Sequence, residues 1–110
     1  MNINGFARNY MARYLSGEEY LMHVATLIER QLKEWNQNYE LFVLKLYNYE
    51  VIINNQDDYY YVQLSESELH SLQKSGSYEV DRKVWGELLI QGLPIIKGKG
   101  NYIEMVLYNF

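Results

Sequence analysis

Residues 40–64 have the sequence ELFVLKLYNYEVIINNQDDYYYVQL, which predicts consecutive β-strands. Aliphatic, β-branched and aromatic residues dominate both ends of this segment, and the polar run NNQDD at 54–58 separates them. We expect strands over about 40–47, 49–54 and 59–64, with antiparallel pairing across the polar loop. Asn48 marks either a bulge or a tight bend between the first two strands.

Two helices are predicted before these strands, over about 3–15 and 17–36. The first has an apolar stripe at three- and four-residue spacing, formed by Ile3, Phe6, Tyr10 and Tyr14. The second begins at Ser16, because Ser16 and Glu19 have the spacing of a capping box. Its stripe continues over about five turns, through Tyr20, Leu21, Val24, Leu27, Ile28, Leu32 and Trp35.

Two shorter helices and a hairpin are predicted after the strands. Ser65 and Glu68 form a second capping-box pattern, and Asp81 is placed to cap the next helix. The predicted helices span about 66–75 and 82–91, and the predicted strands about 94–97 and 101–108. In the last strand, alternation places Ile103, Met105 and Leu107 on one face.

This order of elements favours an α+β fold in a single domain, 1–110. We expect a mainly antiparallel sheet of about 4–5 strands. The two N-terminal helices and the two short middle helices are expected to pack on one face of this sheet.

Composition narrows the classes of function. The formal net charge is −4 and the ten Lys and Arg residues are dispersed, which disfavours binding to nucleic acid, because phosphates require clustered cations. The absence of cysteine excludes disulfides and thiolate ligands. The sequence shows neither a secretory signal nor an apolar run of about 20 residues, so we expect a cytoplasmic protein that contacts no membrane.

The chain contains twelve tyrosines, and in the predicted strands they fall on the opposite register from the aliphatic residues, so one face of the predicted sheet is rich in tyrosine. Alternation in 59–64 places Tyr59, Tyr61 and Gln63 on one face of the strand and Tyr60, Val62 and Leu64 on the other. In the first strand we expect Phe42, Leu44 and Leu46 to face the helices. The other face of the sheet is then predicted to bind a partner through Lys45, Tyr47, Tyr59, Tyr61, Gln63, Tyr102 and Tyr108.

Tyrosine suits a binding face because it offers a large rigid contact area and a hydroxyl. The alternative is that these tyrosines only stabilise the sheet, since tyrosine has high strand propensity. Codon usage in an A/T-rich bacterial or phage genome would also raise their number.

Residues typical of catalysis and metal binding are sparse. His23 follows Glu19 by one turn and His70 follows Glu66 by one turn, but catalysis needs a mutual constellation of groups and not one such pair. No spacing of ligands typical of zinc or calcium sites occurs. We therefore predict no catalytic residue, metal or cofactor.

The sequence favours a small non-enzymatic module that binds another protein through a tyrosine-rich sheet face. An inhibitor, an antidote or a phage anti-defence protein is compatible with this prediction, as is a homodimer through a C-terminal edge strand. The first alternative is a single-stranded nucleic-acid binder that stacks bases on sheet aromatics. The second is a small enzyme that uses His23 or His70.

Overall fold

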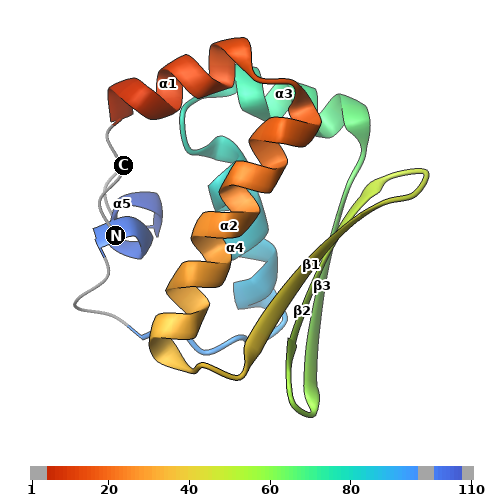
Figure 1. The fold of residues 1–110 in the computed structure, drawn as a ribbon, viewed down its shortest axis with the longest axis vertical. Helices are drawn as coiled ribbons and strands as arrows, with labels where there is room; N and C mark the ends of the chain where they lie inside the picture. Colours follow the sequence, from red (N-terminus) through yellow and green to blue (C-terminus); the bar gives the residue numbers. More distant parts are fainter. Residues whose placement is uncertain (1–4, 97–100, 108–110) are drawn as a thin grey trace.

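The computed structural model describes residues 5–96 and 101–107, which fold as one α+β domain with an antiparallel sheet (Figure 1). In these residues three strands and five helices follow one another in the order α1, α2, β1, β2, β3, α3, α4, α5. The predicted α+β class and antiparallel sheet are therefore confirmed. The described sheet has three strands, fewer than the 4–5 expected.

The sheet consists of β1 (Tyr39–Lys45), β2 (Tyr49–Asn55) and β3 (Asp58–Leu64), in the order β1-β2-β3. Residues 46–48 form a tight turn in which the Leu46 amide donates to the Asn48 carbonyl at 3.0 Å, so β2 is a separate strand. A two-residue turn joins β2 to β3. In it Gln56 has φ +56°, the left-handed region that glycine favours.

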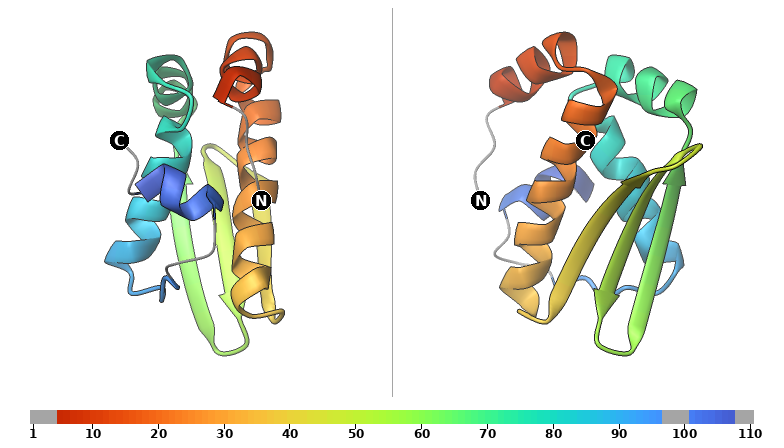
Figure 2. Two further views of the ribbon diagram at one scale, coloured as in Figure 1. Left: turned by 90° about the vertical axis from the view of Figure 1, so that its left-hand side faces the viewer. Right: turned by 45° about the vertical axis from the view of Figure 1, so that its right-hand side comes forward.

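Helices α2 (Gly17–Trp35) and α4 (Glu79–Ile90) pack on one face of the sheet, α2 against β1 and α4 against β3 (Figures 1 and 2). The predicted capping box begins α2, since Ser16 Oγ accepts from the Glu19 amide at 3.1 Å and Glu19 Oε1 accepts from the Ser16 amide at 3.0 Å. The core between these layers includes Tyr20, Leu21, Ile28, Leu32, Val51, Ile53, Val62, Leu64, Val84, Trp85 and Leu88.

Helix α1 (Gly5–Tyr14) extends from the N-terminal end of α2, away from the sheet (Figure 1). Its buried residue is Arg8, and its predicted apolar stripe faces outward instead: Phe6, Tyr10 and Tyr14 are 81%, 60% and 64% exposed. Ile3 lies outside the described residues. The rotation of α1 is set by an ion pair between Arg8 and Asp81 of α4, which spacing of apolar residues cannot reveal.

The middle helices differ in how well their starts are predicted. Helix α3 (Glu66–Ser75) matches the prediction, and Ser65 Oγ accepts from the Glu68 amide at 3.0 Å. Helix α4 begins at Glu79, earlier than predicted, and its N-cap residue Tyr78 makes no side-chain cap. Asp81 was expected to be that cap. It lies inside the helix and is fully buried, because Arg8 binds its carboxylate.

The predicted C-terminal hairpin is wrong. Residues 101–107 form a helix, α5 (Asn101–Leu107), and residues 94–96 form no regular element, while position 97 lies outside the described residues. Tyr102, Ile103 and Val106 are buried, and their spacing of one and three residues fits a helix and not the alternation expected of a strand. Contacts with α4 select the helix: the Tyr102 hydroxyl donates to Asp81 at 2.5 Å, and Arg82 Nε donates to the Val106 carbonyl at 2.8 Å.

Candidate functional site

The described helices cover one face of the sheet and leave the other face uncovered (Figure 2). Strand pairing fixes which residues lie on this open face, because directly opposite residues in an antiparallel sheet share a face. Three rows cross the strands from β1 through β2 to β3: Glu40, Asn54 and Tyr59; Phe42, Ile52 and Tyr61; Leu44, Glu50 and Gln63. These nine residues are called the open face below.

The centre of the open face is apolar and aromatic. Phe42 is 48% exposed and Tyr61 is 46% exposed, and Ile52 between them is half-buried. Leu44 and Tyr59 extend this patch into the neighbouring rows and are 42% and 69% exposed. A continuous row of large apolar side chains across a sheet is the kind of exposed patch that marks an interaction surface.

The formal charges of the open face are both negative. Glu40 and Glu50 stand on either side of the Phe42 row, and no Lys or Arg lies in the three rows. Partial burial and the carboxylate of Glu50 raise the pKa of the Tyr61 hydroxyl. The open face therefore combines an apolar centre with an acidic rim, which repels phosphate groups and disfavours the nucleic-acid alternative.

One residue on each edge strand of the sheet is bonded by a side chain from α2 or from the C-cap of α4. On β1, the Leu41 amide donates to Glu29 Oε2 of α2 at 3.1 Å. On β3, the Tyr61 amide donates to Gln91 Oε1 at 2.9 Å, and Gln91 Nε2 donates to the Tyr61 carbonyl at 2.6 Å. Gln91 thereby occupies the place of a paired strand residue. Side chains that bond part of an edge hinder addition of another strand there, which favours the open face as the binding surface of this sheet.

Six of the seven residues predicted to bind a partner lie in three separate places, and the seventh is not described. Tyr59, Tyr61 and Gln63 lie on the open face as expected. Tyr102 does not, because it is fully buried in α5. Tyr108 lies outside the described residues.

Lys45 and Tyr47 lie at the β1–β2 turn and not on the open face. Lys45 Nζ is 2.9 Å from Glu66 Oε1 and 4.9 Å from the centre of the Tyr49 ring. Tyr47 is 92% exposed. These two residues therefore form a second, separate region.

Phe42, Leu44 and Ile52 are functional candidates that the sequence prediction missed. Phe42, Leu44 and Leu46 were expected to face the helices, and this prediction is wrong, since they are 48%, 42% and 61% exposed. Both faces of β1 are apolar, so its own pattern does not distinguish the inward face. The position of the turn at 46–48 sets the register of β1 on β2, which pairs Val43 with Val51 and Phe42 with Ile52. Polar Glu50 and Asn54 flank Ile52 at alternate positions of β2, which marks the Ile52 face as the outward one.

A groove of about 900 Å³ lies beside the β1–β2 turn, between the N-terminal ends of α2 and α3. It includes Lys45, Tyr47, Glu66 and His70 in its lining. Anion binding is not favoured here, because Ser16 and Ser65 already accept from the amides of the first turns, and Glu18 and Glu66 add negative charge.

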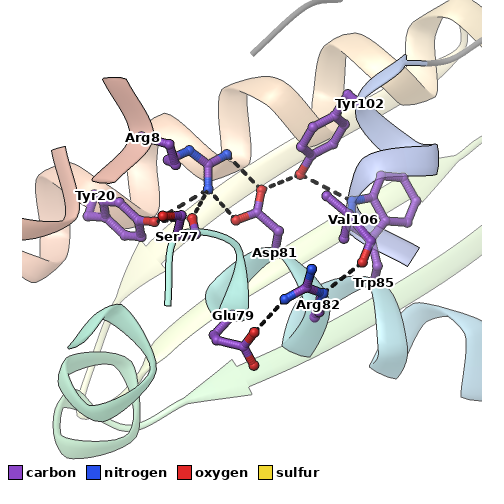
Figure 3. A network of polar contacts seen from close by, with 9 residues as sticks. All are labelled: Arg8, Tyr20, Ser77, Glu79, Asp81, Arg82, Trp85, Tyr102 and Val106. Atoms are coloured by element: carbon purple, nitrogen blue, oxygen red, sulfur yellow. Dashed lines mark hydrogen bonds and ion pairs between the residues drawn. The ribbon is translucent and has the colours of Figure 1, made fainter. Parts of the chain in front are cut away.

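A polar cluster is buried between α1, α4 and α5 (Figure 3). Both Nη atoms of Arg8 donate to the carboxylate of Asp81, with Nη2 at 2.8 Å from Oδ2, and Nη1 also donates to the Ser77 carbonyl at 2.8 Å. The Tyr102 hydroxyl donates to Asp81 and accepts from Trp85 Nε1 at 3.2 Å.

This buried cluster is closed to solvent and its charges are paired within the fold. Burial lowers the pKa of Arg8, but the hydrogen bonds and charge of Asp81 outweigh that effect and raise it above its ordinary value. Burial and the charge of Asp81 raise the pKa of Tyr102 well above 10. Arg8, Asp81 and Tyr102 are 0% exposed, so no substrate reaches them in this conformation.

The two histidines lack the carboxylate partners that their spacing suggested. Glu19 is engaged in the capping box, and Glu66 pairs with Lys45. Burial and the charge of Arg8 lower the pKa of His23. Within residues 5–96 and 101–107, no three His, Asp or Glu side chains converge as a metal site would require, and no helix is long and apolar enough to cross a bilayer.

Comparison with protein-family models, curated protein sequences and solved structures finds no match to this chain. Its function is therefore argued from the geometry and chemistry of the open face.

Proposed function

We propose that this chain is a protein-binding module and that the open face is its docking surface. The observation that carries the proposal is the row Phe42, Ile52 and Tyr61, which crosses all three strands and is exposed at both ends. A few side chains near the centre of a protein interface, often aromatic ones, supply most of its binding energy. Glu29 and Gln91 each bond one residue of an edge strand, at Leu41 and Tyr61, which favours recognition through the side chains of the open face over strand addition.

Charge defines the chemistry of the partner. The acidic side chains Glu40 and Glu50 flank the apolar row, so the complementary surface carries Lys or Arg around an apolar or aromatic centre. The net charge of −4 adds a long-range attraction for such a surface. A module of this kind acts by occupying its partner, which is how an inhibitor or antidote works.

The test is co-purification of a stoichiometric partner from the cells that express the chain, with substitutions on the open face. Phe42→Ser and Tyr61→Ser should each reduce capture of the partner at least tenfold. Met22→Ser is the matched control, because Met22 lies on α2 and is 47% exposed, close to the 48% of Phe42. Capture by the control should equal that by the unchanged protein.

Two further measurements make the test specific. Capture should weaken as salt is raised, because charges around the rim are screened. Hydrogen exchange should slow in β1, β2 and β3 on binding. Retention of the same partner by Phe42→Ser and Tyr61→Ser, with melting temperatures unchanged, would refute the assignment of the open face.

A further inference from the structure

Helix α1 presents a second exposed aromatic surface. Tyr10 and Tyr14 lie one turn apart, are 60% and 64% exposed, and have ring centres 4.6 Å apart. Arg13 lies beside them and is exposed, and the described part of the chain records no ion pair for it. The helix contains no Asp or Glu. Tyr10, Arg13 and Tyr14 are called the α1 ridge below.

The α1 ridge is held rigidly in this outward orientation. Arg8, on the opposite side of the helix, is fixed by Asp81 and by the Ser77 carbonyl. At the C-terminal end, Gln73 Nε2 donates to the carbonyls of Ala12 and Leu15 at 3.0 and 2.9 Å. Exposed aromatic side chains on an anchored helix lose little further freedom on binding, which favours association.

The α1 ridge has the chemistry that the open face requires of a partner. The open face has an apolar centre with Glu40 and Glu50 as its formal charges, and the ridge has an aromatic centre with Arg13. A face-to-face pair of two sheets would instead bring acidic residues of both copies together. Charge complementarity therefore favours contact between the α1 ridge of one copy and the open face of another over contact between two open faces.

Dimensions are compatible with such a contact. Three strands about 4.8 Å apart span roughly 10 Å from first to third, close to the diameter of one helix. The seven-residue strands extend roughly 23 Å and the ten-residue α1 roughly 15 Å. One helix laid along the strands therefore fits within the open face and spans roughly two thirds of its length.

We propose, on the basis of the protein-binding function inferred above, that the partner of the open face is the α1 ridge of a second copy of this chain. Each copy carries both surfaces, and α1 extends away from the sheet (Figure 1). The contact is heterologous, so each added copy leaves one ridge and one face available until a ring closes. Few large side chains are involved, which places the interface in the small, weakly binding class.

Sedimentation of the purified full chain tests this directly. The unchanged protein should be monomeric at about 1 µM and form larger species at several hundred micromolar, as a small interface requires. Association should weaken when salt is raised. Arg13→Glu should abolish it, and Arg13→Gln should weaken it less.

Mixing two defective variants distinguishes this contact from other modes of self-association. The ridge variant Tyr10→Ser/Tyr14→Ser and the face variant Phe42→Ser/Tyr61→Ser should each remain monomeric at several hundred micromolar. Their equimolar mixture should form a dimer that grows no further, because only one intact ridge and one intact face are present. Circular dichroism of each variant confirms that it is folded, and Met22→Ser serves as the control that still assembles.

The outcomes separate the two proposals. If the unchanged protein is monomeric at every concentration, the self-association is refuted, while capture of another protein through Phe42 and Tyr61 would still support the docking function. If the protein assembles but the mixed variants do not form a dimer, another surface is responsible and the ridge-on-face contact is refuted. If the unchanged protein neither self-associates nor captures a partner through the open face, both proposals are refuted.

Discussion

Removing Asp81 should destabilise this protein more than removing any surface charge. In Asp81→Ala the guanidinium of Arg8 stays at 0% exposure with its paired carboxylate absent, and the Tyr102 hydroxyl loses its acceptor. Breaking a fully buried pair from one side costs about 3–5 kcal/mol, because the remaining charge has lost its water and its partner. A domain of this size has a free energy of unfolding of about 5–15 kcal/mol, so the variant approaches the limit of folding.

Urea denaturation followed by circular dichroism measures this loss. With an m-value of about 2 kcal/mol/M, a loss of about 4 kcal/mol lowers the midpoint Cm by about 2 M. The double variant Arg8→Met/Asp81→Leu should lose much less than the sum of the single changes, since apolar residues can replace a buried ion pair at little cost. As a surface control, Glu87→Gln, which breaks the exposed pair with Lys83, should cost less than about 1 kcal/mol.

Two results would refute this reasoning. One is a loss below about 1 kcal/mol for Asp81→Ala, which would mean that the pair is solvated in solution. The other is additivity of the two single changes in the double variant, which would mean that Arg8 and Asp81 are not coupled.

Three other outcomes are expected. Burial lowers the pKa of His23 below 6.5, so the unfolded state binds the proton at a higher pH than the folded state does. Stability should therefore fall as pH drops below about 6.5, and His23→Gln should flatten that dependence in pH-resolved melting. Gln91→Ala should accelerate hydrogen exchange of the Tyr61 amide, lower the free energy of unfolding by about 1 kcal/mol and increase aggregation through the exposed edge of β3. Unchanged exchange of this amide would contradict the bonding of Gln91 to the edge. Gln56→Gly should raise stability by up to about 1 kcal/mol, since glycine takes φ +56° without strain, and Gln56→Val should lower it in the same denaturation series.

Local signals predicted most of the fold. Ser16 and Ser65 begin α2 and α3 as their capping patterns indicate, and the polar run at 54–58 is the turn region of an antiparallel pair. These features depend on residues close in sequence, so the sequence alone contains the information. The same is true of Tyr59 and Tyr61, whose exposure follows from strict alternation with buried neighbours in β3.

The errors arose where distant residues decide the structure. The apolar pattern of residues 101–107 suits both a strand and a helix, and Asp81, about twenty residues earlier, fixes the helix through Tyr102. Asp81 also binds Arg8, from the other end of the chain, and so turns the aromatic side of α1 outward. The open face was only partly predicted, because the inward side of β1 depends on its pairing with β2 and not on its own composition.

Alternation along the strands separates the side chains that form the core from the side chains that face outward. In β3, Tyr60, Val62 and Leu64 are buried, while Tyr59, Tyr61 and Gln63 make up the outward set. Changes in the outward set need not create cavities or unpaired groups in the core. A lineage could therefore drift from one partner to another, and an engineer could randomise the open face as a recognition library, while the scaffold beneath it stays the same.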